Sequence, residues 1–322
     1  MSTSARRALQ VLDYLSVNER GTFTLSELAR ALKISPGSMF AILQVMAEGG
    51  YVSRHPRHKT YTLGPAVAAA GHAASVAHPV IELARAEMIN LAAVTGHECS
   101  GTVLVGKDVL CIAVEGKPTG FPVELAPGQR VPLLPPLGQP FMAWMPPAEL
   151  EDWIATIPSD LQKRVADYIK SHGPIVKQRG YSIGIEILSA TRPDVTRELA
   201  ERPNDPRVRE AFLQQFFERQ DNFAVREFDA NSDYIVGNIA APVFDPDGRV
   251  VFSLTMAHIG RLRGSEIPAA AQPVSASAQL LTRQIGGRTP TPGWNRSRDR
   301  FNGSHTDTRY PLHESNRQEV KR

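Results

Sequence analysis

The sequence predicts an α+β protein with an N-terminal winged helix-turn-helix, a linker helix, and a larger C-terminal domain of mixed helices and strands. Two observations lead to this fold class. Between Thr24 and Leu63, two stretches with apolar residues at helical spacing flank a short turn, and two strand-like segments follow. After Gly96 strand-like and helical segments are interspersed, which is typical of a mixed domain.

Length and charge agree with two domains of different character. The chain has 322 residues, enough for about two domains of roughly 150 residues each. The charge is uneven: residues 1–64 carry 8 Lys+Arg and 4 Asp+Glu, residues 65–282 carry 19 and 25, and residues 283–322 carry 9 and 4. A basic N-terminal domain beside an acidic body suggests that nucleic acid binds at the N-terminal end only.

The first helices of the N-terminal domain have clear start signals. The spacing of apolar residues predicts a helix over Ala5–Ser16. A second helix begins after Thr24, because Glu27 three residues later completes a capping box. Ser35 is the N-cap of a third helix, and Pro36 takes its first position, where the missing N–H costs no hydrogen bond.

The third helix is expected to have a buried and an outward side. Its core stripe follows intervals of three and four residues: Met39, Ile42, Leu43 and Met46. The pair Gly49-Gly50 ends the helix. Strands at 51–54 and 60–63 then form a hairpin with a basic tip, and this domain is expected to end at residue 64.

The rest of the chain is expected to hold a linker, a second domain and a tail. The linker helix, Ala66–Ala77, lies within residues 65–78, and the second domain spans 79–285. The elements of that domain are predicted as helix 80–94, strands 100–105 and 109–115, a proline-rich loop 125–137, helices 149–154 and 161–172, a short strand after Tyr181, helices 195–199 and 207–217, a hairpin of strands 235–244 and 249–256, and helix 269–284. Residues 286–322 have few apolar side chains and are predicted to form a disordered basic tail.

The third helix and the hairpin tip supply the candidate DNA contacts. In such a module the second helix of the pair enters the major groove with its N-terminal end first. Side chains that donate hydrogen bonds, touch a thymine methyl or meet phosphates are expected there: Ser35, Gly37, Ser38, Phe40, Gln44, Arg54, Arg57, His58 and Lys59. Phe40 alternatively contacts the linker helix or a partner, and the tip alternatively is a solvated turn.

Motifs of catalysis and of metal binding are not found in the sequence. It contains no GxSxG, GxGxxG, Walker or HExxH pattern, and Asp245 and Asp247 flank Pro246 as in a turn. Its two cysteines, Cys99 and Cys111, do not form a CxxC pair, which favours a reducing cytoplasm. No signal peptide or membrane-spanning stretch is recognised. We therefore predict a protein that is not an enzyme and needs no cofactor.

Several segments resemble the IclR family of bacterial transcriptional regulators. In the N-terminal domain they are Leu28-Ala29, Ile34-Ser35, Leu43, Gly50-Tyr51-Val52, Arg54 and Tyr61-Thr62-Leu63-Gly64. In the C-terminal half they are Gly128 with Val131-Pro132-Leu133 and Leu137-Gly138, Arg179-Gly180-Tyr181 with Glu186, and Ile239–Asp245 with Gly248. The resemblance covers about residues 5–285 in patches. It implies that the second domain is a GAF-like α/β sensor of small organic acids or aromatic catabolites.

The resemblance also implies a set of effector-binding residues. Carried over by position, they are Leu134, Pro136, Leu137, Gly138, Asp233, Asn238 and Thr255. Alternatively, Asn238 and Thr255 are ordinary polar residues of two adjacent strands. Three departures stand out: Ala41 replaces an arginine that is usual in the recognition helix, Leu134-Pro135-Pro136 replaces the usual His-Ala-Thr/Ser and implies a more apolar effector, and residues 187–232 are a helical insertion. The apolar patch of this insertion, with Phe212 and Leu213, is either a core or a dimer surface.

Two functions are consistent with these features. The first is a ligand-responsive regulator of catabolic genes that binds a DNA operator as a homodimer or dimer of dimers, in the bacterial cytoplasm at the nucleoid and not at a membrane. The second is a metabolite-binding or protein-interaction module whose winged helix contacts protein rather than DNA. The basic N-terminal domain favours the first.

Overall fold

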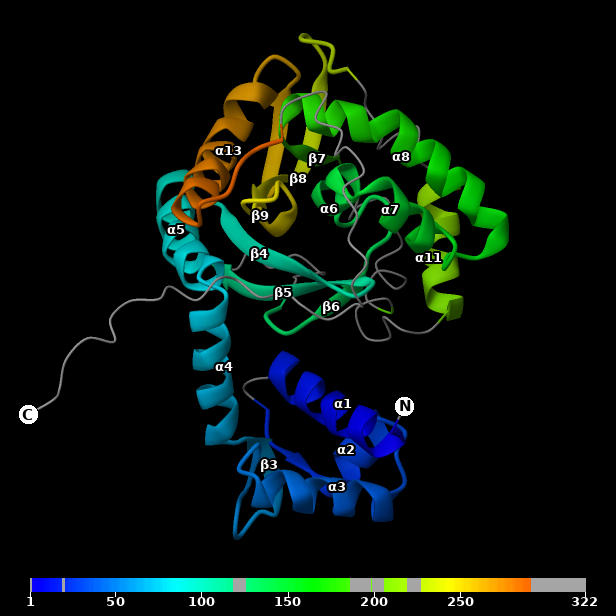
Figure 1. Cartoon of the computed structure of the whole chain (residues 1–322), viewed down its shortest axis with the longest axis vertical. Helices are drawn as coiled ribbons and strands as arrows, with labels where there is room; N and C mark the ends of the chain where they lie inside the picture. The colour runs from blue at the N-terminus through cyan, green and yellow to red at the C-terminus, as the bar shows by residue number, and fades with distance from the viewer. Residues whose placement is uncertain are drawn as a thin grey trace, which may run out of the picture.

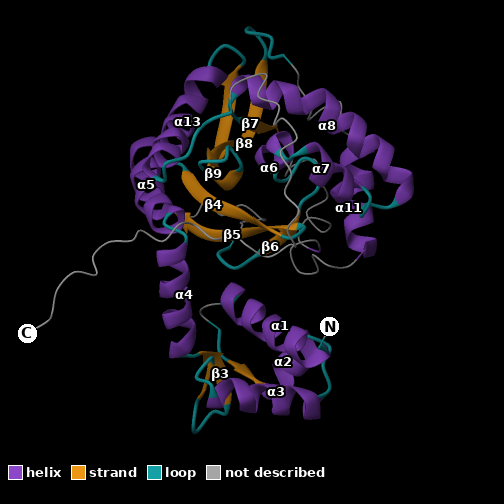
Figure 2. Cartoon of the chain, in the orientation of Figure 1, coloured by secondary structure: helices purple, strands orange, loops and turns teal. Residues whose placement is uncertain are grey.

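A small N-terminal domain and a larger domain are joined by a single helix in the computed structural model of this protein (Figure 1). The structure describes residues 2–18, 21–117, 126–185, 198, 206–218 and 227–290. Figure 2 shows the larger domain as a curved sheet with helices packed on both of its sides. The α+β fold class expected from the sequence is confirmed.

The N-terminal domain consists of three helices and a three-stranded sheet. The helices are α1 (Thr3–Val17), α2 (Leu25–Ala31) and α3 (Pro36–Glu48), and the strands are β1 (Phe23–Thr24), β2 (Val52–Arg54) and β3 (Thr60–Leu63). The antiparallel sheet has the order β1-β3-β2. The two-residue strand β1 was not predicted, because it is too short to show an alternating pattern and gains its stability only from pairing with β3.

Local capping fixes where α2 and α3 begin, as predicted. The Thr24 hydroxyl accepts a hydrogen bond from the backbone of Glu27, while the Glu27 carboxylate accepts one from the backbone of Thr24 at 2.7 Å. Ser35 caps α3, and Pro36 occupies its first turn. The predicted stripe of α3 is inward: Met39, Leu43 and Met46 are buried, and Ile42 packs against the same core.

The helix α4 (Pro65–Ala77) leads from this domain to the next and covers nearly the same residues as the helix expected at Ala66–Ala77. In Figure 1 it spans the space between the two domains, and its first turn lies beside the N-terminal domain, where the Ala66 N–H donates to the Gly50 carbonyl. None of its 13 residues, all of which the structure describes, is buried. Its sequence from Pro65 to Ala77 also lacks any Asp, Glu, Lys or Arg. This helix therefore has no charged side chain and no buried residue.

The larger domain is built on one six-stranded antiparallel sheet. The strands are β4 (Glu98–Val105), β5 (Asp108–Glu115), β6 (Arg130–Pro132), β7 (Ser182–Ile185), β8 (Asp233–Phe244) and β9 (Val250–Arg263), in the order β6-β5-β4-β9-β8-β7. The helices are α5 (Val80–Thr95), α6 (Gln139–Trp144), α7 (Pro147–Ile154), α8 (Ser159–Arg179), α11 (Pro206–Glu218) and α13 (Ile267–Gln284).

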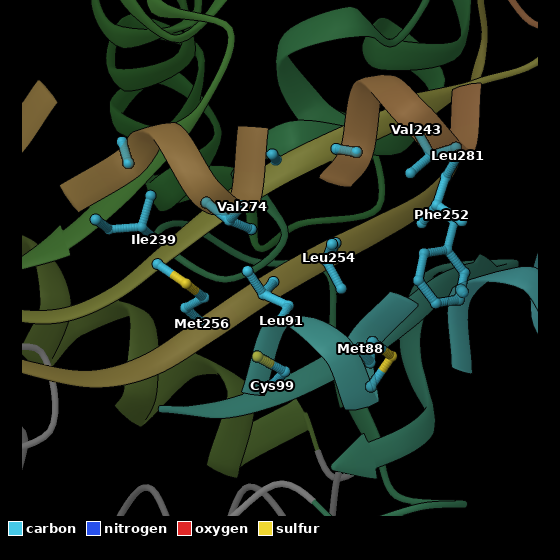
Figure 3. Close-up of a cluster of buried hydrophobic side chains, with 14 of the residues drawn as sticks. Met88, Leu91, Cys99, Ile239, Val243, Phe252, Leu254, Met256, Val274 and Leu281 are labelled. Carbon is cyan, nitrogen blue, oxygen red and sulfur yellow. The ribbon is translucent and has the colours of Figure 1, made fainter. Parts of the chain in front are cut away.

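Two cores hold the helices of this domain to the sheet. On one face, α5 and α13 bury a cluster with the strands β4, β8 and β9, which includes Met88, Phe252, Leu254 and Leu281 (Figure 3). On the other side, α6, α7, α8 and α11 enclose a second cluster, which includes Phe141, Trp153 and Val165. The insertion's Phe212, Leu213 and Phe217 are buried in this second cluster, so its apolar patch is core.

The predictions for three stretches of this domain were incomplete. The proline-rich loop predicted at 125–137 contains β6, because a strand at the edge of a sheet tolerates the missing N–H of Pro132. The short helix α6 was not predicted. The helix predicted over 161–172 continues through Pro174 to Arg179. A proline within a helix costs about 3 kcal/mol, and burial of the following turn at Val176 offsets part of that cost.

Other expectations concern residues that the structure does not describe. The predicted helix at 195–199 lies outside the described residues except for position 198, as do residues 291–322 of the predicted tail and Glu186. Among the described segments, no helix combines the length and hydropathy needed to cross a bilayer.

Candidate nucleic-acid interface and effector face

The nine predicted DNA contacts lie on α3 and on the β2–β3 hairpin, at the end of the molecule away from the larger domain (Figure 1). Eight of them are exposed, and Ser38 is half-buried. The structure thus brings all nine to one small domain. Whether they bind DNA stays a prediction.

The start of α3 holds two serine hydroxyls in a cap. The Ser35 hydroxyl donates to the Ser38 hydroxyl at 2.9 Å and accepts from the Ser38 backbone N–H at 3.4 Å. Because the cap uses these lone pairs, the remaining N–H groups of the first turn are the donors available to a phosphate. The positive end of the helix dipole points the same way.

The outward face of α3 is largely apolar. Phe40 is 54% exposed and Val45 68% exposed, and the exposed Ala41 lies between them. The Gln44 amide donates to the Glu48 carboxylate at 3.1 Å along the helix. The helix carries no Lys or Arg at any of its 13 positions. The cations of the domain therefore lie elsewhere.

The hairpin tip carries cations in a defined turn. The His55 ring nitrogen Nδ1 accepts from the backbone N–H groups of Arg57 and His58, at 3.3 and 3.1 Å. Lys59 has a positive φ of 57°, and the His55 and His58 ring centroids are 4.6 Å apart. Reasoning from the sequence missed His55, because its role in shaping the turn depends on ring geometry that no motif records.

One face of the large sheet groups polar side chains from four strands. Ala240 pairs with Thr255 and with Ser182, and Thr255 also pairs with Ser100. Asn238 is two residues from Ala240 on β8 and so points to the same face. Asn238 and Thr255 therefore share a face, and their role in binding an effector stays a prediction. Ser100 and Ser182 are buried on it and were missed, because their position depends on strand register.

Gly184, on the edge strand β7, pairs with Asn238 on β8. A Cβ added at Gly184 would lie 2.6 Å from the amide nitrogen of Asn238. The absence of a side chain at Gly184 therefore leaves room for the Asn238 amide beside the edge strand.

The remaining predicted effector residues are more dispersed. Leu134 is buried in the second core, Pro136 is buried and Leu137 packs against that core. Gly138, with φ 67°, precedes α6, and a Cβ there would meet Leu133 at 2.5 Å. Asp233 lies five residues before Asn238, roughly 16 Å along the strand. Its carboxylate is exposed and pairs with Arg261 at 3.4 Å, so the structure does not bring it to the same place.

A cavity of about 20 Å³ lies between α6, α8 and β7. The Gln139 amide donates to the Tyr168 hydroxyl at 3.0 Å, and the Arg179 guanidinium lies 4.7 Å from the centre of the Phe228 ring. Burial raises the pKa of Tyr168 and lowers the pKa of Arg179. This volume holds about one water molecule. None of the seven predicted effector residues, all of them described, lines it; Ser182 links it to the polar face.

The two domains also touch away from α4. Arg130 Nε on β6 lies 3.5 Å from an Asp13 carboxylate oxygen on α1. Beside this ion pair, a Cβ on Gly128 would come within 3.0 Å of the Ser16 Cβ. The residues after β6 lead directly into the Leu134–Gly138 segment, so this contact adjoins the predicted effector loop.

Comparisons with known proteins identify the N-terminal domain. Residues 4–56 match the model of the IclR helix-turn-helix domain. A search of curated protein sequences finds no match. The likeness to solved structures, reported next, extends over both domains.

Three solved structures illustrate that likeness. The IclR transcriptional regulator of Alicyclobacillus acidocaldarius has a TM-score of 0.58 at 18% identity, covering 89% of this chain and 100% of that one. An IclR homologue of Microbacterium hydrocarbonoxydans, solved with 4-hydroxybenzoate, has 0.56 at 14%, covering 88% and 99%. Thermotoga maritima IclR has 0.52 at 16%, covering 88% and 98%. At these identities the likeness establishes the fold.

Proposed function

With an IclR helix-turn-helix domain at residues 4–56 in the fold of an IclR transcriptional regulator, we propose that this protein regulates transcription by binding a DNA operator under the control of a small metabolite. The regulated genes are catabolic, and the effector is an organic acid or aromatic metabolite. The protein works as a homodimer or dimer of dimers in the bacterial cytoplasm, at the nucleoid. The domain boundaries that we propose are 1–64, 65–78 and 79–285.

One observation carries the DNA-binding part of the proposal. The nine candidate residues gather on one small domain with a net charge of +4, while residues 65–282 carry −6. Phosphates attract such a domain without regard to sequence, and the acidic body is repelled from the duplex. This asymmetry orients the N-terminal domain toward DNA.

The effector part rests on the polar sheet face. Ser100, Ser182, Asn238 and Thr255 offer hydroxyl and amide groups beside the apolar second core. Small-molecule sites combine apolar walls with a few fixed polar groups. The relative solved with 4-hydroxybenzoate makes aromatic acids the first probes to test. Leu134, which is buried in the second core, and Pro136, which is also buried, precede α6 and add apolar character to that side of the sheet.

The coupling between effector and DNA uses the connections between domains. The helix α4 and the contact of Asp13 with Arg130 both link the sensor to the N-terminal domain. A metabolite that binds one arrangement of the two domains better than another shifts their equilibrium. In a dimer this shift changes the spacing of the two DNA-binding domains, which must match half-sites separated by whole helical turns.

The DNA-binding proposal is tested by selecting duplexes from a random library with the full chain and measuring affinity at several salt concentrations. Arg57→Ala with Lys59→Ala should weaken binding and lower the salt slope by about two ions. The matched control, Lys163→Ala with Lys170→Ala, removes the same charge from exposed positions of α8 and should leave affinity unchanged. Recovery of no duplex whose binding depends on salt and sequence rejects the proposal.

The effector proposal is tested by thermal shift and calorimetry with 4-hydroxybenzoate, other aromatic acids and short organic acids. A ligand that binds only the folded protein raises its melting temperature. Thr255→Val should abolish that shift for the responding acid. Thr62→Val makes the same change on β3 of the N-terminal domain and should preserve it. An identical response of both variants contradicts a site at Thr255.

A second candidate function is favoured by the exposed apolar side chains of α3. Phe40 and Val45 offer a surface that a protein partner would also cover. If the winged helix contacts protein rather than DNA, Arg57→Ala with Lys59→Ala leaves nucleic-acid affinity unchanged. The salt titration above therefore separates the two functions.

A further inference from the structure

The outward face of α3, which we call its reading face, carries the exposed apolar side chains Phe40, Ala41 and Val45 beside the polar Gln44 and Glu48. Gly37, Ala41, Gln44 and Glu48 follow one another at intervals of three and four residues, opposite the buried Met39, Leu43 and Met46. Phe40 and Val45 flank this line, 54% and 68% exposed. Phe40 is the largest of these side chains, so it dominates the surface that α3 offers to a groove.

The polar groups of the same face have partners within the protein. The hydroxyls of Ser35 and Ser38 serve the helix cap, and the Gln44 amide donates to Glu48. Arginine to guanine is the commonest specific contact in the major groove, and α3 has no cation with which to make it. This helix therefore offers few side chains that could recognise a base by hydrogen bonding.

The major groove displays one apolar group, the 5-methyl of thymine. We infer that α3 selects its operator by the thymine methyl groups, with Phe40 as the principal contact and Ala41 and Val45 beside it. This inference rests on the proposed function, because it requires α3 to enter the groove. It identifies the chemical class that the DNA-binding domain discriminates: a pyrimidine that carries a 5-methyl group.

The hairpin carries cations and α3 does not, so the two elements contribute differently to DNA binding. Arg54, Arg57 and Lys59 lie on the hairpin, where they meet phosphates and add affinity for any sequence. The apolar face of α3 adds no attraction to phosphates, so its contribution appears only where methyl groups are present. Affinity and selectivity are therefore separable by changing one group of residues at a time.

Deoxyuridine tests the inference directly, because it pairs like thymine and lacks only the methyl group. The full chain is used to select a duplex from a random library, and each thymine of that duplex is then replaced by deoxyuridine. Burial of one methyl group contributes about 0.8 kcal/mol, which corresponds to about a fourfold loss of affinity when it is removed. At least one position should show this loss.

Two variants assign the effect to its side chain. Phe40→Ala should weaken binding to the thymine duplex and should bind the thymine and deoxyuridine duplexes equally. Arg57→Ala should weaken binding to both by the same factor and keep the fourfold difference. Phe40 is half exposed, so its replacement should leave the melting temperature and the light-scattering mass unchanged.

The outcomes distinguish this inference from the proposed function. If no duplex is selected, the proposed function fails and the inference fails with it. If a duplex is selected but every replacement by deoxyuridine leaves its affinity unchanged, the inference alone is overturned. It is also overturned if Phe40→Ala retains the thymine preference, or if it dissociates an oligomer, since Phe40 would then face a second copy.

Discussion

Single residues decide how closely segments approach in this protein. Gly64 lies at the junction of β3 and α4, where a Cβ would overlap the carbonyl oxygen of Gly50. Gly71, within α4, has open space around it and no positive φ. A side chain is therefore excluded at Gly64 for steric reasons, whereas the structure leaves room for one at Gly71.

Replacing these two glycines by alanine should have opposite effects. Gly64→Ala should destabilise the N-terminal domain by about 2 kcal/mol or more, because backbone has to move. Gly71→Ala should stabilise α4 by about 0.5–1 kcal/mol, as expected inside an exposed helix. Thermal unfolding of the two variants beside the parent chain checks both, and a destabilised Gly71→Ala would indicate a contact that the single chain does not have.

The two cysteine thiols are buried, and burial raises the pKa of Cys99 and of Cys111 to about 12. An unfolded thiol ionises near pH 9, so the folded state holds its proton more tightly. This contribution to stability is complete below pH 9 and is lost as the pH rises from 9 to 12.

Stability should therefore fall between pH 9 and pH 12, by about 1–2 kcal/mol per thiol at pH 10. Denaturant unfolding at pH 7 and pH 10 measures this fall, and Cys99→Ala should make it smaller. Alkylation at pH 8 should modify neither thiol until the protein unfolds. Rapid alkylation of the folded chain at that pH would contradict the expected burial.

At the scale of the elements, helix α4 exposes an uncharged surface that the described part of the chain does not bury. It is neutral and has no buried residue along its 13 described positions, and Val76 is 67% exposed. Surface helices are normally amphipathic, with one charged side in water. We therefore propose that, if the protein dimerises, a second copy packs on this helix.

Val76→Lys should accordingly weaken the dimer. A charge in an apolar contact has to lose its hydration, so the variant should sediment as a monomer at concentrations where the parent chain is a dimer. Val105→Lys, at the exposed end of β4, introduces the same charge elsewhere and should leave the mass unchanged. Equal masses for all three proteins would place the dimer contact, if present, away from α4.

At the scale of the whole molecule, α1 of the N-terminal domain contacts β6 of the larger domain. The pair Asp13–Arg130 is half exposed, so it contributes at most about 1 kcal/mol. That amount is enough to change the ratio of two domain arrangements about fivefold. Its proximity to the Leu134–Gly138 segment makes it a candidate for coupling.

Arg130→Asp should release the N-terminal domain from the larger domain and raise the radius of gyration measured by small-angle X-ray scattering. The double exchange Asp13→Arg with Arg130→Asp should restore the smaller value, because it recreates the ion pair with reversed polarity. If the single variant scatters like the parent chain, α4 alone holds the two domains in place.

The sequence by itself determined the three helices and the hairpin of the N-terminal domain and most elements of the larger domain. Capping at Thr24 and Ser35, the stripe from Met39 to Met46, and the turn before Gly248 act between residues close in the chain, so their signals are local. The resemblance to the IclR family, stated from short motifs, agrees with the domain match at residues 4–56.

Only the tertiary structure decided which side chains meet. Strand pairing added β1 beside β3 and β6 beside β5. Burial allowed α8 to continue through Pro174. Strand register placed four polar side chains on one face of the sheet: Ser100, Ser182, Asn238 and Thr255. These are long-range interactions, and no local pattern encodes them. Asp233 is separated from that group because it lies five residues before Asn238 on the same extended strand.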